Sequence, residues 1–450
     1  MLKSHDFTTT PIPVLIRKLA VPASVGFIFN TLFNVVDTYF GGRISTSALA
    51  AMSLTFPVFF IILALGMGMG TGTTVLISQS LGSGKNEEAK KYGFQAVSFS
   101  IINSVLLTIV GLGAAPFLFR ILGAADEYLA ISVKYMDTIL YGTVFFLINS
   151  ILNALLTARG DTKTYRNYLI VGFFLNLILD PWFIYGGLGF PALGIRGIGF
   201  STVLIQFIGA IYMITITQKY KIFENARFND FIPRRKYYAA LFGQGFPASL
   251  NMLTVAIGIF VITYFASQFG KEAVAAYGIA TRIEQIALLP TIGLNIAALT
   301  LAGQNMGANI PQRVYESWSL NIRYGLMVIS IGVIAVGLMA NHLIAAFTAD
   351  MKVIEIGAEY LHIAILFFFA YVFLNISVST LQGMKKPLYA IFVGVYRQFL
   401  MPLPLFLLLA VYFGWGPKGI WWGIFMANWS AAIFTFFYTR RKIRNVLSAN

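Results

Sequence analysis

Long apolar runs, separated by short polar and charged segments, follow one another along the whole chain. An α-helix needs roughly 20 apolar residues to cross a lipid bilayer, and each run is long enough. Several runs are longer, so these helices are expected to tilt, kink or extend past the membrane. The pattern predicts an all-α membrane protein with about twelve spans. The expected ranges are 14–42, 47–80, 88–119, 127–158, 165–186, 197–218, 238–268, 273–303, 315–348, 355–381, 388–413 and 419–439.

Composition supports this assignment. The chain is 58% hydrophobic and only 11% charged, with a mean hydropathy of +0.77, whereas soluble domains carry roughly 25% charged residues. The net charge of +15 comes from short clusters between apolar runs, so we expect no nucleic-acid partner. Cysteine is absent, which excludes disulfides and thiolate metal sites. The histidines His5, His342 and His362 are too scattered to suggest a metal site. The run from Val14 is too long for a signal-peptide core and is expected to be retained.

Basic residues are distributed unevenly between alternate loops. An even number of helices places both chain ends, and every second loop, on one side of the membrane. Twenty-two of the 32 Lys and Arg residues, beginning with Lys3, fall on that side, and six fall on the other. The side rich in Lys and Arg faces the cytoplasm. We therefore predict a multi-pass protein of the inner (plasma) membrane with both termini in the cytoplasm.

The second half of the chain repeats the first. Shifting the sequence by 225 residues aligns several short motifs without a gap. The aligned segments are Pro22-Ala23-Ser24 with Pro247-Ala248-Ser249, Thr38-Tyr39-Phe40 with Thr263-Tyr264-Phe265, Gln79 with Gln304, and Gly82 with Gly307. Six spans in each half predict two lobes related by a pseudo-twofold axis along the membrane normal, around a central cavity. The expected boundaries are 1–218 for the N-terminal lobe, 219–236 for a cytoplasmic linker and 237–450 for the C-terminal lobe.

Two acidic residues fall inside predicted spans of the first half. Asp37 lies in the first span, six residues before Arg43, and Asp180 lies in the fifth, six residues before the outer loop that begins at Gly186. Asn176 precedes Asp180 by one helical turn and shares its face. A charged side chain at the membrane centre costs roughly 2.5–3.5 kcal/mol, so such residues are functional candidates by default. Neighbouring carboxylates could alternately bind and release H⁺ or offer hard oxygens to Na⁺; the alternative is a structural hydrogen-bonded cluster joining helices.

Other polar and small residues have simpler interpretations. Gly66, Gly68, Gly70 and Gly72 imitate a dinucleotide motif, but no strand precedes them, so close helix packing is favoured. Glu284 is expected to pair with nearby Arg282, or else to contact substrate. Arg397 is expected to extend toward the membrane surface or to meet backbone carbonyls.

The chain resembles the multidrug and toxic compound extrusion (MATE) family over essentially its whole length. The resemblance rests on the repeat, the proline in each half's first helix, the Gln-x-x-Gly ending each second helix, and Arg159-Gly160-Asp161. It is most similar to the bacterial and archaeal branch that couples transport to a cation in the N-terminal lobe. Asp37, Asn176, Asp180 and Thr202 match that branch's cation-coupling residues, and Asn153 is a further match. Another branch of the family carries one acid in helix 7 and one in helix 10. This sequence has Val255 and Tyr371 at those positions and so lacks both acids.

The resemblance implies a secondary transporter. A membrane enzyme is not favoured, because the sequence contains no group of catalytic residues. We expect an H⁺- or Na⁺-coupled antiporter that exports amphipathic, often cationic, organic compounds by alternating access. No cofactor besides the coupling ion is expected, and the protein is expected to be a monomer in contact with lipid. Asn30, Asn153 and Glu284 are candidate cavity residues, and Pro22 is a candidate hinge of the first helix. The alternative is a flippase or exporter of a lipid-linked or other amphipathic metabolite.

Overall fold

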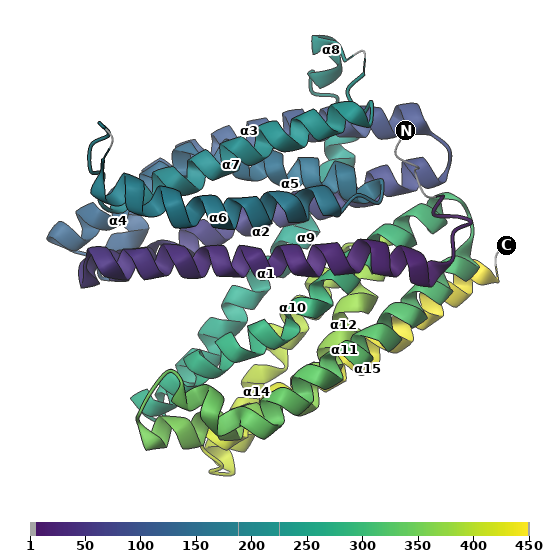
Figure 1. Ribbon diagram of the computed structural model, residues 1–450. Helices are drawn as coiled ribbons and strands as arrows, with labels where there is room; N and C mark the ends of the chain where they lie inside the picture. The colour runs from purple at the N-terminus through teal and green to yellow at the C-terminus, as the bar shows by residue number, and fades with distance from the viewer. Residues whose placement is uncertain (1–5, 188, 225, 449–450) are drawn as a thin grey trace. The chain divides into compact units, whose positions relative to one another are not determined.

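The computed structural model describes residues 6–187, 189–224 and 226–448, so Lys3 and His5 lie outside the described residues. Within these ranges the chain is helical and forms no β-strand beyond one isolated bridge. Figure 1 follows the helices in chain order. Their bounds are α1 Ile12–Ile44, α2 Thr46–Gly82, α3 Asn86–Ile121, α4 Asp126–Tyr141, α5 Thr143–Ala158, α6 Lys163–Tyr185, α7 Ile195–Lys219, α8 Phe228–Phe231, α9 Arg235–Ser267, α10 Lys271–Gly307, α11 Pro311–Ala345, α12 Met351–Gly383, α13 Leu388–Val395, η1 Tyr396–Leu400, α14 Pro402–Phe406, η2 Leu407–Tyr412 and α15 Pro417–Leu447.

The predicted membrane spans are confirmed. Eleven described segments are long and apolar enough to cross a bilayer, and the bent pair of α4 and α5 makes twelve when taken as one span. This span bends by 45° at Gly142. A Cβ atom at Gly142 would lie only 2.7 Å from a methyl carbon of Val203 on α7. The close approach of α7 therefore requires a glycine at the bend.

The outer faces of the helices are apolar. On α11, Ile331, Ile334 and Leu338 are 72%, 61% and 80% exposed. Their spacing of three and four residues places them on one side of the helix. A contiguous apolar stripe on the surface needs an apolar solvent, and helices satisfy their backbone groups internally, as lipid requires. This stripe is suited to contact with lipid tails.

The helices group into two compact units. Unit 1 comprises Met1–Ser24, Leu81–Gly84 and Leu250–Asn450; unit 2 comprises Val25–Ser80 and Lys85–Ser249. The units differ from the predicted lobes, because the start of α1 belongs to unit 1 and the start of α9 to unit 2. The helices α1 and α9 each contribute to both units, and in each the division falls two residues after the aligned prolines, Pro22 and Pro247. The predicted lobe boundaries at 218 and 237 remain a prediction.

In unit 1, α12 packs against α10, α11 and α15 (Figure 1). Its buried aromatic side chains Phe367 and Phe368 belong to one hydrophobic core, together with Trp318 of α11 and Trp421 of α15. In unit 2, α7 packs against α4, α5 and α6. Each unit therefore contains one helix that packs against several others, α12 in unit 1 and α7 in unit 2.

Glycines allow α2 to pack closely in unit 2. A Cβ atom at Gly68 would collide with the backbone nitrogen of Ser249 on α9, and one at Gly72 would lie 2.6 Å from the backbone nitrogen of Gly245. Small residues spaced four apart on both helices let the two backbones approach each other. On another side of α2, the Ser150 hydroxyl donates a hydrogen bond to the Gly66 carbonyl at 2.6 Å. The predicted close helix packing is confirmed for Gly68 and Gly72.

The predicted linker docks on α3 of unit 2. Gln95 donates from its amide nitrogen to the backbone carbonyls of Asp230 and Ile232, at 2.7 and 2.8 Å, and accepts from the backbone nitrogen of Arg234 at 2.8 Å. Its neighbour Phe94 packs edge-on against Phe231. The segment between α7 and α9 is therefore held by a buried amide and an aromatic contact.

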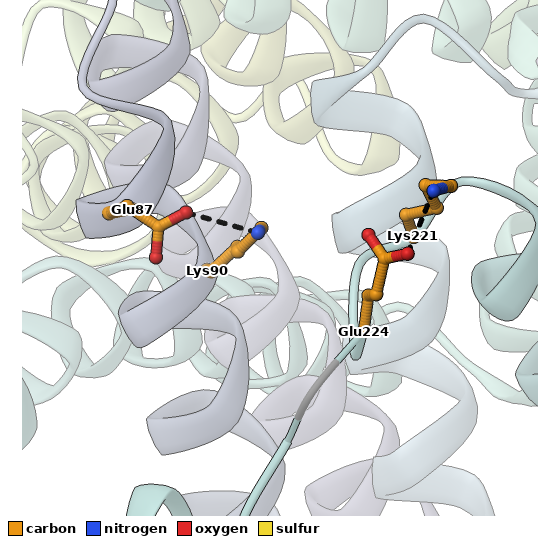
Figure 2. Close-up of polar contacts among 4 residues, drawn as sticks. All are labelled: Glu87, Lys90, Lys221 and Glu224. Atoms are coloured by element: carbon orange, nitrogen blue, oxygen red, sulfur yellow. Dashed lines mark hydrogen bonds and ion pairs between the residues drawn. The ribbon is translucent and has the colours of Figure 1, made fainter.

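Ion pairs near the start of α3 and after α7 are exposed. Figure 2 shows Glu87 with Lys90, 3.0 Å apart, and Lys221 with Glu224, 2.7 Å apart. Both pairs join residues three positions apart on the surface, where an ion pair contributes about 0–1 kcal/mol. They add little to the docking of the linker, which depends on Gln95 and Phe94 instead.

Candidate functional site

Three helices of unit 2 bring polar side chains together close to their ends. Asp37 lies seven residues before the end of α1, Asp180 lies five residues before the end of α6, and Ser201 lies six residues after the start of α7. At about 1.5 Å of rise per residue, these positions are one to two turns from the helix ends. The site is therefore displaced toward one end of the helices, as the sequence predicted for Asp37 and Asp180.

A single amide links the two acids. The Asn176 nitrogen donates one hydrogen bond to Asp37 Oδ1 and another to Asp180 Oδ1, both 2.9 Å long. These two bonds use both hydrogens of the amide. Because Asp37 Oδ1 and Asp180 Oδ1 each lie 2.9 Å from the same nitrogen, they cannot be farther apart than twice that distance. Asn176 and Asp180 share a face because they are one turn apart on α6. The carboxylates of α1 and α6 thus form a close pair.

Two hydroxyl groups of α7 complete the cluster. Ser201 donates to Asp180 Oδ1 at 2.6 Å. The Thr202 hydroxyl lies 3.4 Å from Asp37 Oδ2 and 2.9 Å from the carbonyl of Ile198. Because a hydroxyl has one hydrogen, Thr202 donates to only one of these acceptors at a time. Its contact with Asp37 is longer than the bonds that either acid accepts from Asn176 or Ser201, and it competes with the Ile198 carbonyl.

The cluster is buried and lacks a cationic partner. Asp37 is 7% exposed, and Asn176 and Asp180 are fully buried. In the described part of the chain, no Lys, Arg or His nitrogen forms an ion pair with either acid. Two carboxylates that share a donor away from water cannot both keep their charge without a counter-ion. The site therefore favours the arrival of a positive charge.

Two oxygens of this cluster are free to receive such a charge. Asp180 Oδ2 and Asn176 Oδ1 are buried and accept no hydrogen bond from the described residues. A buried acceptor without a partner costs about 1–3 kcal/mol, which a proton or a cation would recover. Carboxylate, amide and hydroxyl oxygens are hard ligands. The site can hold H⁺ on a carboxylate or Na⁺ among these oxygens.

The structure brings together the four predicted coupling residues, Asp37, Asn176, Asp180 and Thr202. It does not add the predicted cavity residues to the cluster. Asn30 is exposed and its carbonyl accepts from Asn34 on the same helix, whereas Asn153 accepts from Thr157 at 3.2 Å.

Sequence reasoning missed one residue of the site, Ser201, which donates to Asp180. Its signal was its place directly before Thr202 in the same helix.

The Arg159-Gly160-Asp161 motif forms the turn between α5 and α6. Gly160 has a φ of +84°, a conformation that glycine adopts without strain. Asp161 accepts from the backbone nitrogen of Thr164 at 3.0 Å and from the Tyr220 hydroxyl at 2.9 Å. Burial and the Asp161 carboxylate raise the pKa of Tyr220, which keeps the hydroxyl protonated and able to donate. The motif therefore fixes the start of α6, the helix that carries Asn176 and Asp180.

Two expectations about unit 1 are wrong. Glu284 does not pair with Arg282, because residues two apart on a helix do not face each other; it accepts from the Tyr360 hydroxyl at 2.6 Å. Arg397 contacts side chains rather than the expected backbone carbonyls in the described part of the chain. Its guanidinium donates to Asn428 Oδ1 at 3.2 Å and lies 5.3 Å from the centre of the Tyr371 ring.

The second repeat carries no copy of the acidic cluster. In the repeat register, Ile262 corresponds to Asp37 and Leu403 to Asp180. Ile262 is buried and Leu403 packs against the hydrophobic core of unit 1. Neither side chain can bind a cation, so the acidic site occurs once per chain at these aligned positions.

The apolar spans of the described residues, arranged as two repeats, define a multi-pass membrane protein. A family model described as MatE matches residues 22–182 and, separately, residues 247–407. The second match begins 225 residues after the first, which confirms the internal repeat. Together the two matches cover more than half of the chain, and the chain belongs to the MatE family of transporters.

Relatives and solved structures agree with this assignment. The chain is 28% identical to a probable multidrug resistance protein NorM of Thermotoga maritima, over 90% of this chain and 88% of the relative. It is 27% identical to an FAD transporter of Shewanella oneidensis, over 90% of each. A solved structure of a MOP superfamily transporter from Pyrococcus furiosus matches with a TM-score of 0.92 at 26% identity, covering 99% of this chain and 98% of that one.

Proposed function

We propose that this protein is a cation-coupled antiporter that exports amphipathic, often cationic, organic compounds by alternating access. The observation that carries the proposal is the buried pair Asp37 and Asp180, which share one amide donor and have no cationic partner among the described residues. The multidrug resistance relative supports the substrate class. The protein works as a monomer in the inner membrane and needs no cofactor besides the coupling ion.

The coupling ion changes the charge and the hydrogen bonding of the cluster. With both acids ionised, the amide of Asn176 and the hydroxyls of Ser201 and Thr202 share two negative charges. Binding of H⁺ or Na⁺ removes one charge and supplies a partner for the free oxygens of Asn176 and Asp180. The two states favour different arrangements of α1 relative to α6 and α7, because the contacts of Asp37 differ between them. Ion binding thereby shifts the conformation that accepts substrate.

The helix that carries Asp37 also carries a proline. Pro22 lies in the interior of α1, which continues from Ile12 to Ile44. Proline has no N–H for the helical hydrogen bond and weakens the helix at that point. We propose that α1 bends at Pro22 when Asp37 exchanges its contacts.

Transport into vesicles tests the proposal directly. The purified protein is reconstituted with a fluorescent organic cation, and a pH gradient and a Na⁺ gradient are imposed separately. We expect one gradient to drive accumulation against the concentration gradient and the matching ionophore to abolish it. Accumulation that follows neither gradient would rule out coupling to these ions.

The proposed topology is tested by reporter fusions. A fusion in the 219–236 linker and another at the C-terminus should both report the cytoplasm, because their loops belong to the basic side. A fusion near Lys271, between α9 and α10, should report the outside. A cytoplasmic signal near Lys271 would contradict the assignment of the two sides.

A second candidate is export of an amphipathic metabolite. The FAD transporter of Shewanella oneidensis, 27% identical over 90% of each chain, favours this candidate. Both functions use the same coupling site, so the vesicle assay separates them by substrate. FAD or a lipid-linked metabolite replaces the organic cation, and the substrate transported faster at equal concentration decides between them.

A further inference from the structure

A cavity of about 430 Å³ lies between α11, α12 and α15 of unit 1, three helices that pack against one another (Figure 1). Asn341 lines it four residues before the end of α11, Glu355 four residues after the start of α12, and Lys418 one residue after the start of α15. By the predicted topology, these helix ends lie on the outer side of the membrane. The cavity is therefore placed where lipid head groups meet water.

Two of the helices present charged faces to this cavity. On α12, Glu355, Glu359 and His362 follow one another at spacings of four and three residues. On α15, Lys418 and Trp422 are four residues apart. Such spacings place each set on one side of its helix. The cavity wall therefore combines two carboxylates, an imidazole, an ammonium group and an indole ring.

The charges of the cavity are open to a further partner. Lys418 Nζ lies 2.9 Å from Glu359 Oε1, but the two side chains are 55% and 37% exposed. An ion pair at the surface contributes little to stability, so Lys418 can turn to another anion at small cost. Glu355 is exposed and forms no ion pair among the described residues. A ligand with one positive and one negative group can therefore bind Glu355 and Lys418 together.

A second, apolar cavity adjoins the first. It has a volume of about 560 Å³, shares Lys418 and Trp422 with the first cavity, and adds the exposed side chains of Trp415 and Met426. Met426 lies eight residues beyond Lys418, about 12 Å deeper along α15. Tryptophan is enriched at the boundary between membrane and water. The second cavity therefore extends the polar one toward the hydrocarbon region and is suited to an acyl chain.

Apolar stripes on two helices lead away from the cavities. On α11, Asn341 follows Leu338, the most exposed residue of the apolar stripe, by three residues and shares its side of the helix. On α15, Met426 is followed after seven and eleven residues by Ile433 and Phe437, both exposed. Exposed apolar side chains along a membrane span face lipid tails. An occupant can therefore keep its polar end in the first cavity and lay an apolar chain along the span.

We propose that the two cavities bind a phospholipid whose head group carries a primary ammonium, as in phosphatidylethanolamine. The ammonium group donates to Glu355, the phosphate accepts from Lys418, and an acyl chain lies against Trp422 and Met426. A lipid with only a negative charge meets the two carboxylates of α12, and a trimethylated ammonium has no N–H to donate, so the primary ammonium is preferred. Because the lipid contacts helices that are distant in sequence, its binding favours the folded protein.

Native mass spectrometry of the purified, full-length protein in detergent tests the lipid site. The probes, added separately, are phosphatidylethanolamine, phosphatidylcholine and phosphatidylglycerol with the same acyl chains, and phosphoethanolamine without them. We expect phosphatidylethanolamine to bind about tenfold or more tightly than the other two lipids, and phosphoethanolamine to bind far more weakly. Glu355→Gln should remove most of this preference, because it keeps the shape of the side chain but loses the charge that holds the ammonium group. Lys418→Gln should weaken all three lipids, since each contains the phosphate.

Two matched controls change the same residue types elsewhere in unit 1. Glu316→Gln neutralises an exposed acid near the other end of α11, and Lys352→Gln removes an exposed lysine of α12 that lies 3.9 Å from Glu272. Neither should change the affinity for any of the lipids. Equal affinity for the three lipids, or an undiminished preference in Glu355→Gln, would overturn the site. Phosphoethanolamine that bound as tightly as the lipid would overturn the lipid as the occupant and point to a soluble ligand instead.

Discussion

Asp37→Asn is expected to reduce gradient-driven drug transport to the level of vesicles that lack the transporter, with the protein still folded and inserted. The substitution keeps the size of the side chain and its ability to accept from Asn176 and Thr202, but it removes the titratable charge. The cluster then carries at most one negative charge instead of two, so binding of a cation is no longer favoured by the repulsion between two carboxylates. The measurement is gradient-driven accumulation of a fluorescent cation in vesicles, with the amount of folded protein checked by size-exclusion chromatography.

Three further variants locate the coupling. Asp180→Asn should have nearly the same effect, because its carboxylate shares the amide of Asn176. Asp137→Asn on α4 is the matched control: it neutralises another acid in a membrane span, outside the hydrogen bonds of the cluster, and should keep gradient-driven transport. Glu284→Gln should change substrate affinity and leave the dependence on the ion gradient intact. Uncoupling by Glu284→Gln together with normal coupling in Asp37→Asn would place the energy-converting site in unit 1.

Gly72→Ala is expected to destabilise the protein by about 1–3 kcal/mol or more. The added Cβ would lie 2.6 Å from the backbone nitrogen and 2.9 Å from the Cα atom of Gly245 on α9. Backbone atoms cannot rotate away as a flexible side chain does, so α2 and α9 must separate along their contact. The measurement is thermal unfolding of the purified protein in detergent, together with its yield from the membrane.

Gly66→Ala provides the control on the same helix. Its Cβ would lie 3.7 Å from that of Ser150, an ordinary van der Waals distance. The exchange also favours the helix, because alanine has the higher helix propensity. We expect Gly66→Ala to unfold at or slightly above the temperature of the unsubstituted protein. If both variants lost the same stability, the loss would not depend on the contact between Gly72 and Gly245, and the explanation by close packing would be wrong.

The spans and much of the coupling site could be predicted because their signals are local. Apolar length identifies a span without any knowledge of its neighbours. Asn176 and Asp180 are one turn apart, so their shared face follows from helix geometry. The repeat then shows that the acids belong to one half, since the register places Ile262 and Leu403 at the matching positions.

Contacts between distant helices could not be predicted in the same way. Tyr360 is 76 residues from Glu284, and only the packing of α10 against α12 brings its hydroxyl to the carboxylate. The sequence suggested the nearest base, Arg282, which lies on a different side of α10. The bend at Gly142 was missed for a similar reason, because it depends on the approach of Val203 and not on a proline.

The division of α1 and α9 between the two units has a consequence for how the protein is assembled during synthesis. Residues 12–24 pack with segments made after residue 250, and residues 235–249 pack with segments made before them. When the ribosome has completed the first six spans, unit 2 still lacks residues 235–249 of α9. Residues 12–24 of α1 must likewise wait for the segments after residue 250 with which they pack. A gene cut at the 219–236 linker would therefore yield two fragments that are each incomplete. Neither fragment would mature alone, and stable protein would form only when both were produced in the same membrane.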